Sequence, residues 1–434
     1  MRVAYISAGA GGMLCGSCMH DNTLAAALTR LGHDVALVPT YTPMRTDEHD
    51  VSLPQVFYGA VNLYLQQRSA LFRHTPRAID RLLDMRAVLG WAARAGSSTS
   101  AADLGDLTLS VLQGEEGRQA KELDRLSSWL RDSFKPQIVH LSNSMFLGMA
   151  RRLRQELGVP IVCSVQGEDL FIDGLPEEHR GRVTRLLKER ARDADVFVAN
   201  SRYYAGHMAE LLGVPPERMR IVSLGLNLEG HGGPASRQAG SRFRIGYMAR
   251  VSTEKGLHLL ADAFGMLARE PGAPPIELAV AGYLGPRDRP YFQQVQERIR
   301  SWGLEGSTQY LGEIDRAEKI RFLGSLDALC VPATFREPKG LYVLEALANG
   351  VPVVEPRHGA LPELLESTGG GLLFEPGSAR DLAAALARLR DDPAGRAEMG
   401  RRGRQAVLDR FSDRVMAEET LKVYLACLPP AGGS

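Results

Sequence analysis

Residues 336–354 combine a turn, a helix and a strand in one segment: Arg336-Glu337-Pro338-Lys339-Gly340-Leu341-Tyr342-Val343-Leu344-Glu345-Ala346-Leu347-Ala348-Asn349-Gly350-Val351-Pro352-Val353-Val354. Gly340 marks a turn at the start of the predicted helix, and the apolar run 351–354 follows the helix at once. A helix followed directly by a buried strand predicts an α/β layer. Two carboxylates, Glu337 and Glu345, stand eight residues apart around the turn.

This arrangement suits a sugar nucleotide. A turn that opens a helix presents unpaired backbone N–H groups and the positive end of the helix dipole, which favour a phosphate. Carboxylates at the two ends, here Glu337 and Glu345, can accept hydrogen bonds from sugar and ribose hydroxyls. The segment therefore predicts a sugar-nucleotide pocket.

The segment resembles the Glu-x7-Glu signature of the retaining family 4 (group 1) glycosyltransferases with the GT-B architecture. Residues 358–363, His-Gly-Ala-Leu-Pro-Glu, resemble the Gly-Gly-x-Pro-Glu turn of that family. Residues 249–256, Ala-Arg-Val-Ser-Thr-Glu-Lys-Gly, are similar to its Gly-Arg-x-x-x-x-Lys-Gly loop. These matches span roughly residues 243–411, and weaker ones extend through 1–227. The resemblance implies two Rossmann-like, doubly wound parallel-sheet domains that face each other across a cleft.

The apolar pattern of the whole chain agrees with such an α/β fold, because strand-like runs alternate with helical segments. The predicted strands are 3–7, 35–38, 138–141, 161–165, 196–199 and 220–223, then 244–248, 277–281, 308–311, 328–332, 351–354 and 371–374. The predicted domains are an acceptor-side domain at 1–228 with a helical insertion at about 58–131, a Gly/Pro/Ser-rich linker at 229–242, a nucleotide-sugar-binding domain at 243–405, and a helix with tail at 406–434. The resemblance implies that this last helix, predicted over 406–425, packs back on the first domain.

Arg250 and Lys255 follow the predicted strand 244–248. Two cations on a Gly-containing loop can neutralise the diphosphate that leaves during glycosyl transfer, without a metal ion. The alternative is a solvated loop with surface ion pairs, since both residue types are usually exposed. The neighbouring Glu-x7-Glu segment favours the diphosphate site.

The resemblance assigns further roles. It implies that Glu337 contacts hydroxyls of the transferred sugar and that Glu345 contacts the ribose. Lys339 stands at a position that is often aromatic in the family, so the wall around the sugar is expected to differ. The remaining donor contacts are expected from Gly11, Gly12, Gly282, Leu311, Gly340 and Leu341. A front-face transfer assisted by the donor's own phosphate is the mechanism that the family implies.

Two loops near the predicted strand ends of the first domain need separate interpretation. The Gly-rich loop 8–22 precedes a helix predicted over 22–31, with Asp21 or Asn22 as a candidate N-cap. Cys15 and Cys18 in that loop are a redox pair, half a metal site, or loop packing and substrate contacts. No second Cys or His pair has ligand spacing, so we expect no metal.

Gln166 stands where family members commonly carry a histidine at the reaction centre. Glutamine donates and accepts hydrogen bonds but cannot carry a proton. Either the donor sugar differs, or Glu168 or Asp169 takes over, or activity is reduced. Asp169 is alternatively a helix cap.

Composition bounds the remaining possibilities. The chain has 434 residues and a formal net charge of +1, which gives no support to nucleic-acid binding. It shows no signal peptide and no apolar run long enough to span a membrane, and its five cysteines suggest a reducing cytoplasm. The basic segment 64–94 either lies on an anionic membrane at its inner face or forms a helix with one buried and one solvated side.

The sequence therefore predicts a retaining hexosyltransferase that uses a UDP- or GDP-type sugar donor, needs no metal or other cofactor, and acts on a glycan, lipid or small-molecule acceptor. Two alternatives stay open. One is a GT-B sugar-nucleotide epimerase or hydrolase, and the other is a catalytically silent sugar-nucleotide-binding protein.

Overall fold

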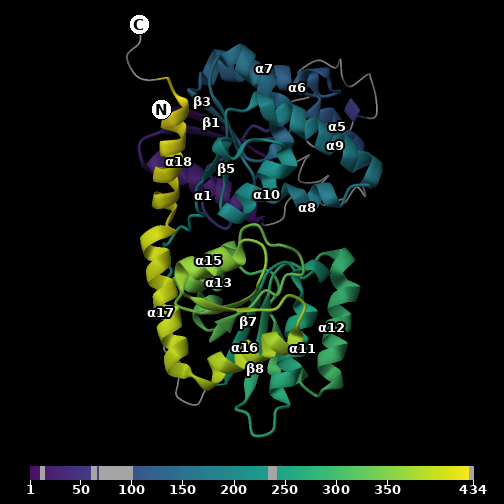
Figure 1. The fold of residues 1–434 in the computed structure, drawn as a ribbon, viewed down its shortest axis with the longest axis vertical. Helices are drawn as coiled ribbons and strands as arrows, with labels where there is room; N and C mark the ends of the chain where they lie inside the picture. Colours follow the sequence, from purple (N-terminus) through teal and green to yellow (C-terminus); the bar gives the residue numbers. More distant parts are fainter. Residues whose placement is uncertain (10–14, 60–65, 68–100, 233–241, 430–434) are drawn as a thin grey trace. The chain divides into compact units, whose positions relative to one another are not determined.

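In the computed structural model, the described residues are 1–9, 15–59, 66–67, 101–232 and 242–429 (Figure 1). They form two compact units. Unit 1 comprises Met1–Gly225 with Asp413–Ser434, and unit 2 comprises Leu226–Ser412. The glycines at 11 and 12, nearly all of the basic segment 64–94, and the linker residues 233–241 lie outside the described residues. No helix among the described residues has the length and hydrophobicity needed to cross a membrane.

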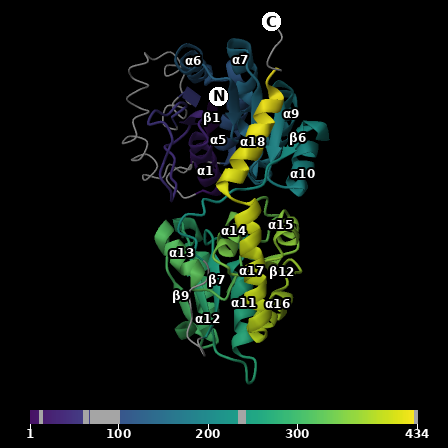
Figure 2. The ribbon, with the colours of Figure 1, turned by 90° about the vertical axis from the view of Figure 1, so that its left-hand side faces the viewer.

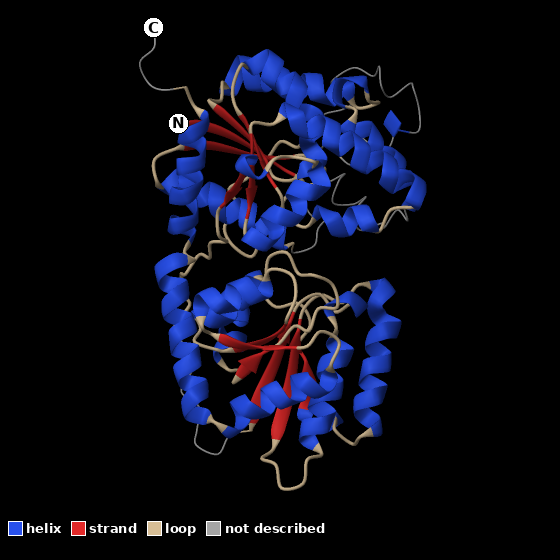
Figure 3. Ribbon diagram, in the orientation of Figure 1, coloured by secondary structure: helices blue, strands red, loops and turns tan. Residues whose placement is uncertain are grey.

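Unit 1 contains a six-stranded parallel sheet with the strand order β2-β1-β3-β4-β5-β6. Its strands are β1 (Arg2–Ser7), β2 (Asp34–Pro39), β3 (Ile138–Leu141), β4 (Ile161–Ser164), β5 (Val196–Ala199) and β6 (Met219–Ile221). The central strands are almost continuous apolar runs because helices cover both faces of the sheet, as Figure 3 shows. The strand order reverses between β1 and β3, and ligands of such sheets bind at this switch point.

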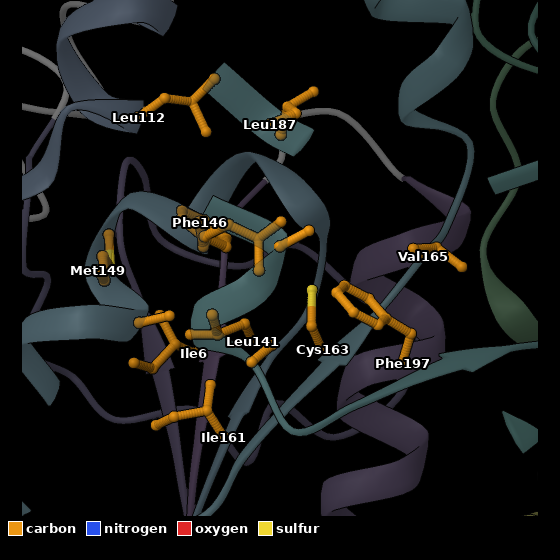
Figure 4. Packing of buried hydrophobic residues seen from close by; sticks show 14 of the residues in the cluster. Ile6, Leu112, Leu141, Phe146, Met149, Ile161, Cys163, Val165, Leu187 and Phe197 are labelled. Carbon is orange, nitrogen blue, oxygen red and sulfur yellow. The ribbon is translucent and has the colours of Figure 1, made fainter. Parts of the chain in front are cut away.

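The sheet of unit 1 divides its core into two clusters, one on each face, and the helices cover them. The helices are α1 (Gly16–Arg30), α5 (Ala101–Leu112), α6 (Ala120–Trp129), α7 (Leu147–Leu157), α8 (Glu168–Asp173), α9 (Glu177–Arg190), α10 (Arg202–Leu212) and α18 (Asp413–Cys427). Figure 4 shows the larger cluster, where Ile6, Leu141 and Cys163 from neighbouring strands gather near Phe146. Helices α5 and α6 belong to the predicted helical insertion.

The C-terminal residues form two helices where the sequence predicted one over 406–425. Helix α17 (Pro393–Arg410) belongs to unit 2, and α18 belongs to unit 1. The helix ends at Arg410 because the Phe411 carbonyl accepts a hydrogen bond from the Leu226 N–H at 2.8 Å, and Ser412 forms a β-bridge with Leu226. Helix α18 packs beside α1 (Figure 2).

His140 on β3 connects α18 to the sheet of unit 1. Its Nδ1 lies 2.6 Å from the Tyr424 hydroxyl, and its Nε2 lies 2.8 Å from Ser164 Oγ. The imidazole is completely buried, and burial lowers its pKa to about 3. His140 is therefore neutral in the folded protein at physiological pH.

This burial predicts an acid-sensitive contribution to stability. In the unfolded chain a histidine has a pKa of about 6.5, so at lower pH the unfolded state binds a proton that folded His140 does not. We expect the unfolding free energy of the wild type to fall by about 1.4 kcal/mol per pH unit more than that of His140→Gln between about pH 6 and about pH 4. Urea unfolding of both proteins at several pH values measures this difference. Parallel curves would show that folded His140 does take up the proton.

Unit 2 contains the second six-stranded parallel sheet, ordered β12-β11-β10-β7-β8-β9. Its strands are β7 (Phe243–Met248), β8 (Ile276–Ala281), β9 (Thr308–Tyr310), β10 (Ala328–Leu329), β11 (Val353–Pro356) and β12 (Gly371–Phe374). Its helices are α11 (Leu257–Ala268), α12 (Arg289–Ser301), α13 (Arg316–Gly324), α14 (Leu341–Ala348), α15 (Leu361–Thr368), α16 (Ala379–Asp391) and α17. The strand order reverses between β7 and β10, so the loops after these two strands meet at the switch point.

The predicted fold class, with two Rossmann-like parallel sheets, is confirmed. Two strands of unit 2 differ most from the prediction: β10, predicted over 328–332, ends at Leu329, and β11, predicted over 351–354, lies two residues later at Val353–Pro356. The N–H of Val331 bonds to the Glu355 side chain at 3.3 Å in place of a neighbouring strand. The Glu355 side chain therefore takes the place of the backbone acceptor that Val331 would have in a longer β10.

Candidate functional site

The central feature of unit 2 is an ion pair at the switch point of its sheet. Lys255 follows β7, Glu337 follows β10, and Lys255 Nζ lies 2.7 Å from Glu337 Oε2. The two side chains are 20% and 8% exposed. The Lys255 ammonium also lies 4.7 Å from the centre of the Phe335 ring, a cation–π distance. Fixed in this way, the lysine is a positioned charge rather than a solvated one.

Glu337 is held as a carboxylate. Burial by itself would raise the pKa of Glu337, but the charge and hydrogen bond of Lys255 outweigh it. The Lys339 backbone N–H, 3.3 Å from Glu337 Oε1, acts in the same direction, so the pKa lies below its usual value. An ionised carboxylate can only accept hydrogen bonds, which suits contact with hydroxyl groups.

The turn after Glu337 opens α14 with unpaired donors. Gly340 is the N-cap, in the left-handed region at φ 77°, and no side chain caps the helix. Among the described residues, the backbone N–H groups of Gly340, Leu341 and Tyr342 have no hydrogen-bond acceptor. The helix therefore presents adjacent donors and the positive end of its dipole, which is an anion site.

The loop 358–363 supports Glu337 from the other side. The Ala360 N–H donates to the Glu337 carbonyl at 2.8 Å. Gly359 has a φ of 64°, and a Cβ on it would lie 2.7 Å from the Glu337 backbone nitrogen. Only glycine allows this approach. The Gly-Ala-Leu-Pro-Glu turn thus fixes the backbone that carries the carboxylate.

Glu345, in the middle of α14, is buried and forms an ion pair with Lys319 of α13. Both side chains are at most 9% exposed. The Glu345 backbone carbonyl also accepts a hydrogen bond from Asn349 at 2.9 Å. The sequence indicated Glu345 but missed Lys319. The available signal was its spacing, three and four residues before Phe322 and Leu323, which places Lys319 on the apolar side of a helix.

The remaining residues predicted in unit 2 are less closely joined to this pair. Arg250 forms an ion pair with Glu254 and is about half exposed. Gly282 uses both backbone groups internally, since its N–H donates to Gly312 and its carbonyl accepts from Tyr310. A Cβ at Gly282 would clash with the Ala249 carbonyl, so packing accounts for this glycine. Leu311 follows β9 and is 36% exposed.

In unit 1, Gln166 follows β4, is half-buried, and joins a hydrogen-bond network near the carboxyl ends of β1 and β3. Its Nε2 donates to Asp21 Oδ1 at 2.8 Å and to the Ser142 carbonyl at 2.9 Å. Asp21 also accepts from the Tyr5 and Ser7 hydroxyls. Burial would raise the pKa of Asp21, but its hydrogen bonds and the nearby His20 lower it overall. Asp21 lies inside α1, whose N-cap is Cys15, so the predicted capping role of Asp21 or Asn22 is wrong.

Glu168 and Asp169 share one buried tyrosine. The Glu168 carboxylate accepts from the Ser144 and Gln166 backbone N–H groups, at 2.7 and 2.6 Å. Tyr204 donates to Asp169 Oδ1 at 2.8 Å, and His207 lies 3.3 Å from Asp169 Oδ2. Asp169 is not a helix cap, because Gly167 occupies that position. Glu168 therefore shapes the Gln166 loop, and Asp169 holds a partly exposed histidine.

Comparison with known families agrees with this geometry. Residues 22–225 match the glycosyl transferase 4-like domain, and residues 234–406 match the glycosyl transferases group 1 family. The two matches together take in both units. The chain belongs to the group 1 glycosyltransferases.

Relatives of this glycosyltransferase include a glycogen synthase from Mycobacterium tuberculosis, 27% identical over 71% of this chain and 72% of that protein. A D-inositol 3-phosphate glycosyltransferase from Saccharomonospora viridis is 30% identical over 62% and 65%. Among solved structures, a sucrose-phosphate synthase from Thermosynechococcus elongatus is similar with a TM-score of 0.73, at 18% identity over 98% of each chain. Anabaena HepE in complex with UDP gives 0.69, at 18% identity over 99% of this chain and all of that one. These structures share the two-domain GT-B fold.

All five cysteines of this glycosyltransferase lie among the described residues, and no disulfide bond joins any two of them. In the part of the chain that the structure describes, no group of three His, Cys, Asp or Glu side chains is placed to hold a metal ion.

Proposed function

We propose that this glycosyltransferase moves a hexose-type sugar from a UDP- or GDP-type donor to an acceptor hydroxyl, with retention of the anomeric configuration and without a metal ion. The acceptor class, whether glycan, lipid or small molecule, stays open. The observation that carries the proposal is the Lys255–Glu337 pair beside the unpaired N–H groups of Gly340 and Leu341. A cation and an array of donors next to a carboxylate suit a diphosphate joined to a sugar.

The proposed chemistry follows from these groups. As the bond between the anomeric carbon and the phosphate oxygen breaks, negative charge grows on the leaving diphosphate. In this proposal Lys255 and the N–H groups at the start of α14 stabilise that charge, with Arg250 from the same loop as Lys255, and preorganised groups of this kind act without a metal. Glu337 would accept hydrogen bonds from the transferred sugar, and Glu345 from the ribose.

Related structures support a nucleotide donor. HepE has been solved with UDP, with UDP and glucose, and with UDP-glucose. Gln166 is the one feature that favours the alternative of a catalytically silent protein. Its side-chain amide donates hydrogen bonds to Asp21 and Ser142, and an amide cannot carry a proton.

A thermal-shift titration with UDP, GDP and ADP, each with and without EDTA, tests the proposal. A ligand that binds only the folded protein adds about 2.7 kcal/mol at about 100 times its Kd, which gives a clear rise in Tm. We expect UDP or GDP to raise the Tm, and EDTA to leave the rise unchanged. A rise abolished by EDTA would contradict a metal-independent site, and no rise with any nucleotide would contradict a donor pocket.

The nucleotide that binds then decides which sugar donors are assayed. Release of free sugar without acceptor would favour the hydrolase alternative. Binding without turnover, across donors and acceptors, would favour the silent protein.

A further inference from the structure

Glu355 lies on β11 beneath the donor site and has no ionic partner among the described residues. Its side chain is completely buried. Oε1 accepts the Val331 N–H at 3.3 Å, and Oε2 lies 2.9 Å from the Tyr342 hydroxyl. These two contacts join Glu355 to different parts of the site. Val331 lies near the start of the loop that carries Glu337, and Tyr342 lies in the first turn of α14.

The surroundings of Glu355 favour the neutral acid. Burial raises the pKa of Glu355 well above its usual range, and the negative charge of Glu337 acts in the same direction. Lys255 opposes this shift, but its ammonium is engaged with Glu337. A buried carboxyl group without a cationic partner avoids the cost of desolvating its charge by keeping its proton. The hydrogen bonds from the Tyr342 hydroxyl and the Val331 N–H lower the pKa of Glu355, but they do not cancel the effect of burial.

The contact between Glu355 and Tyr342 lies at the start of α14, where it can position the helix. The first turn of α14 has no side-chain cap, and the N–H groups of Gly340 and Leu341 are left for a ligand. Tyr342 follows Leu341 directly. The contact between its hydroxyl and Glu355 therefore restrains the backbone that carries the N–H groups of Gly340 and Leu341.

We propose that Glu355 and Tyr342 are positioning residues for the donor, with Glu355 joining the Glu337 loop to the first turn of α14. This inference rests on the proposed function, because it assumes that Gly340 and Leu341 bind a nucleotide diphosphate. Glu355 does not touch the reacting atoms. It sets the spacing between the carboxylate that meets the sugar and the N–H groups that meet the phosphate.

Three variants test the inference by nucleotide affinity and steady-state kinetics. Tyr342→Phe removes the hydroxyl, and Glu355→Ala removes both contacts. Glu355→Gln reproduces the neutral acid, because its amide oxygen can accept from Val331 while its NH2 donates to Tyr342. We expect the first two variants to weaken UDP or GDP binding and raise the donor KM by about 3- to 10-fold, a typical range for a lost hydrogen bond. Their kcat should change less, and Glu355→Gln should stay within about twofold of the wild type.

Tyr424→Phe is the matched control, because it removes another buried tyrosine hydroxyl that lies in unit 1. It should lower the Tm and leave nucleotide affinity unchanged. Wild-type affinity in folded Tyr342→Phe would overturn the inference, as would a Glu355→Gln protein as impaired as Glu355→Ala. Failure of the wild type to bind any nucleotide would instead overturn the proposed function.

Discussion

Replacing Lys255 by methionine is expected to lower kcat by about 100- to 1,000-fold, the usual effect of removing one preorganised group that stabilises a leaving anion. Methionine keeps much of the apolar length of the lysine side chain and lacks the ammonium that lies over the Phe335 ring, so the change removes mainly the charge. Because the growing charge on the diphosphate appears only as the bond breaks, kcat should fall more than donor affinity. Turnover of a purified, folded variant with the identified donor measures the effect.

The same substitution should raise the pKa of Glu337. In the wild type the depressed pKa of Glu337 contributes stability that is present above the usual glutamate pKa and is lost as the pH falls through the folded value. Without Lys255, burial is left as the largest influence, so the pKa should rise and that contribution should disappear. Lys255→Arg keeps the charge and should recover part of the activity. Lys422→Met, at an exposed position of unit 1, is the control for losing any lysine. Near-normal turnover of Lys255→Met would remove Lys255 from the site.

The fold followed closely from the sequence because its signals are local. Strands such as β1 and β5 are short apolar runs, and a run of this kind is enough to predict a strand that is buried on both faces. The failures occurred where a distant residue ended an element. Strand β10 stops early because Glu355, 24 residues away, takes the Val331 N–H. The last helix divides because Leu226 bonds to Phe411.

The site residues were predictable where a sequence motif directly follows a strand, because the strand fixes their position. Lys255 and Glu337 meet because they follow two strands that are neighbours at the switch point. The hydrogen-bond partners of the predicted residues in unit 1 were not predictable. Asp21 was interpreted as a helix cap, although its carboxylate accepts hydrogen bonds from Tyr5 and Ser7 on β1 and from Gln166 in the loop after β4. Polar residues in helices usually face water, and only the assembled fold shows which of them are buried.

Removing one partner of the Lys319–Glu345 pair is expected to destabilise the protein by about 3–5 kcal/mol, the cost of leaving a buried charge without its counterion. The pair joins α13 to α14 and is buried on both sides. Lys319→Met and Glu345→Leu should therefore each lower the unfolding free energy. The double variant replaces the pair with apolar groups of similar size and should recover most of the loss. Urea unfolding of the four proteins gives the coupling between the two positions.

Nucleotide affinity separates the two roles of Glu345. If Glu345 accepts hydrogen bonds from the ribose, the double variant should be stable yet bind UDP or GDP about 10-fold or more weakly, because a hydrogen bond to a charged group is worth about 1.5–3 kcal/mol. Lys319→Met alone should bind more tightly than the double variant, since it retains the carboxylate. Glu345→Gln with Lys319→Met keeps a hydrogen-bond acceptor without the charge, so its affinity should lie between the two. A stable double variant with wild-type affinity would reduce the pair to a structural link between two helices, and the ribose would then need another partner.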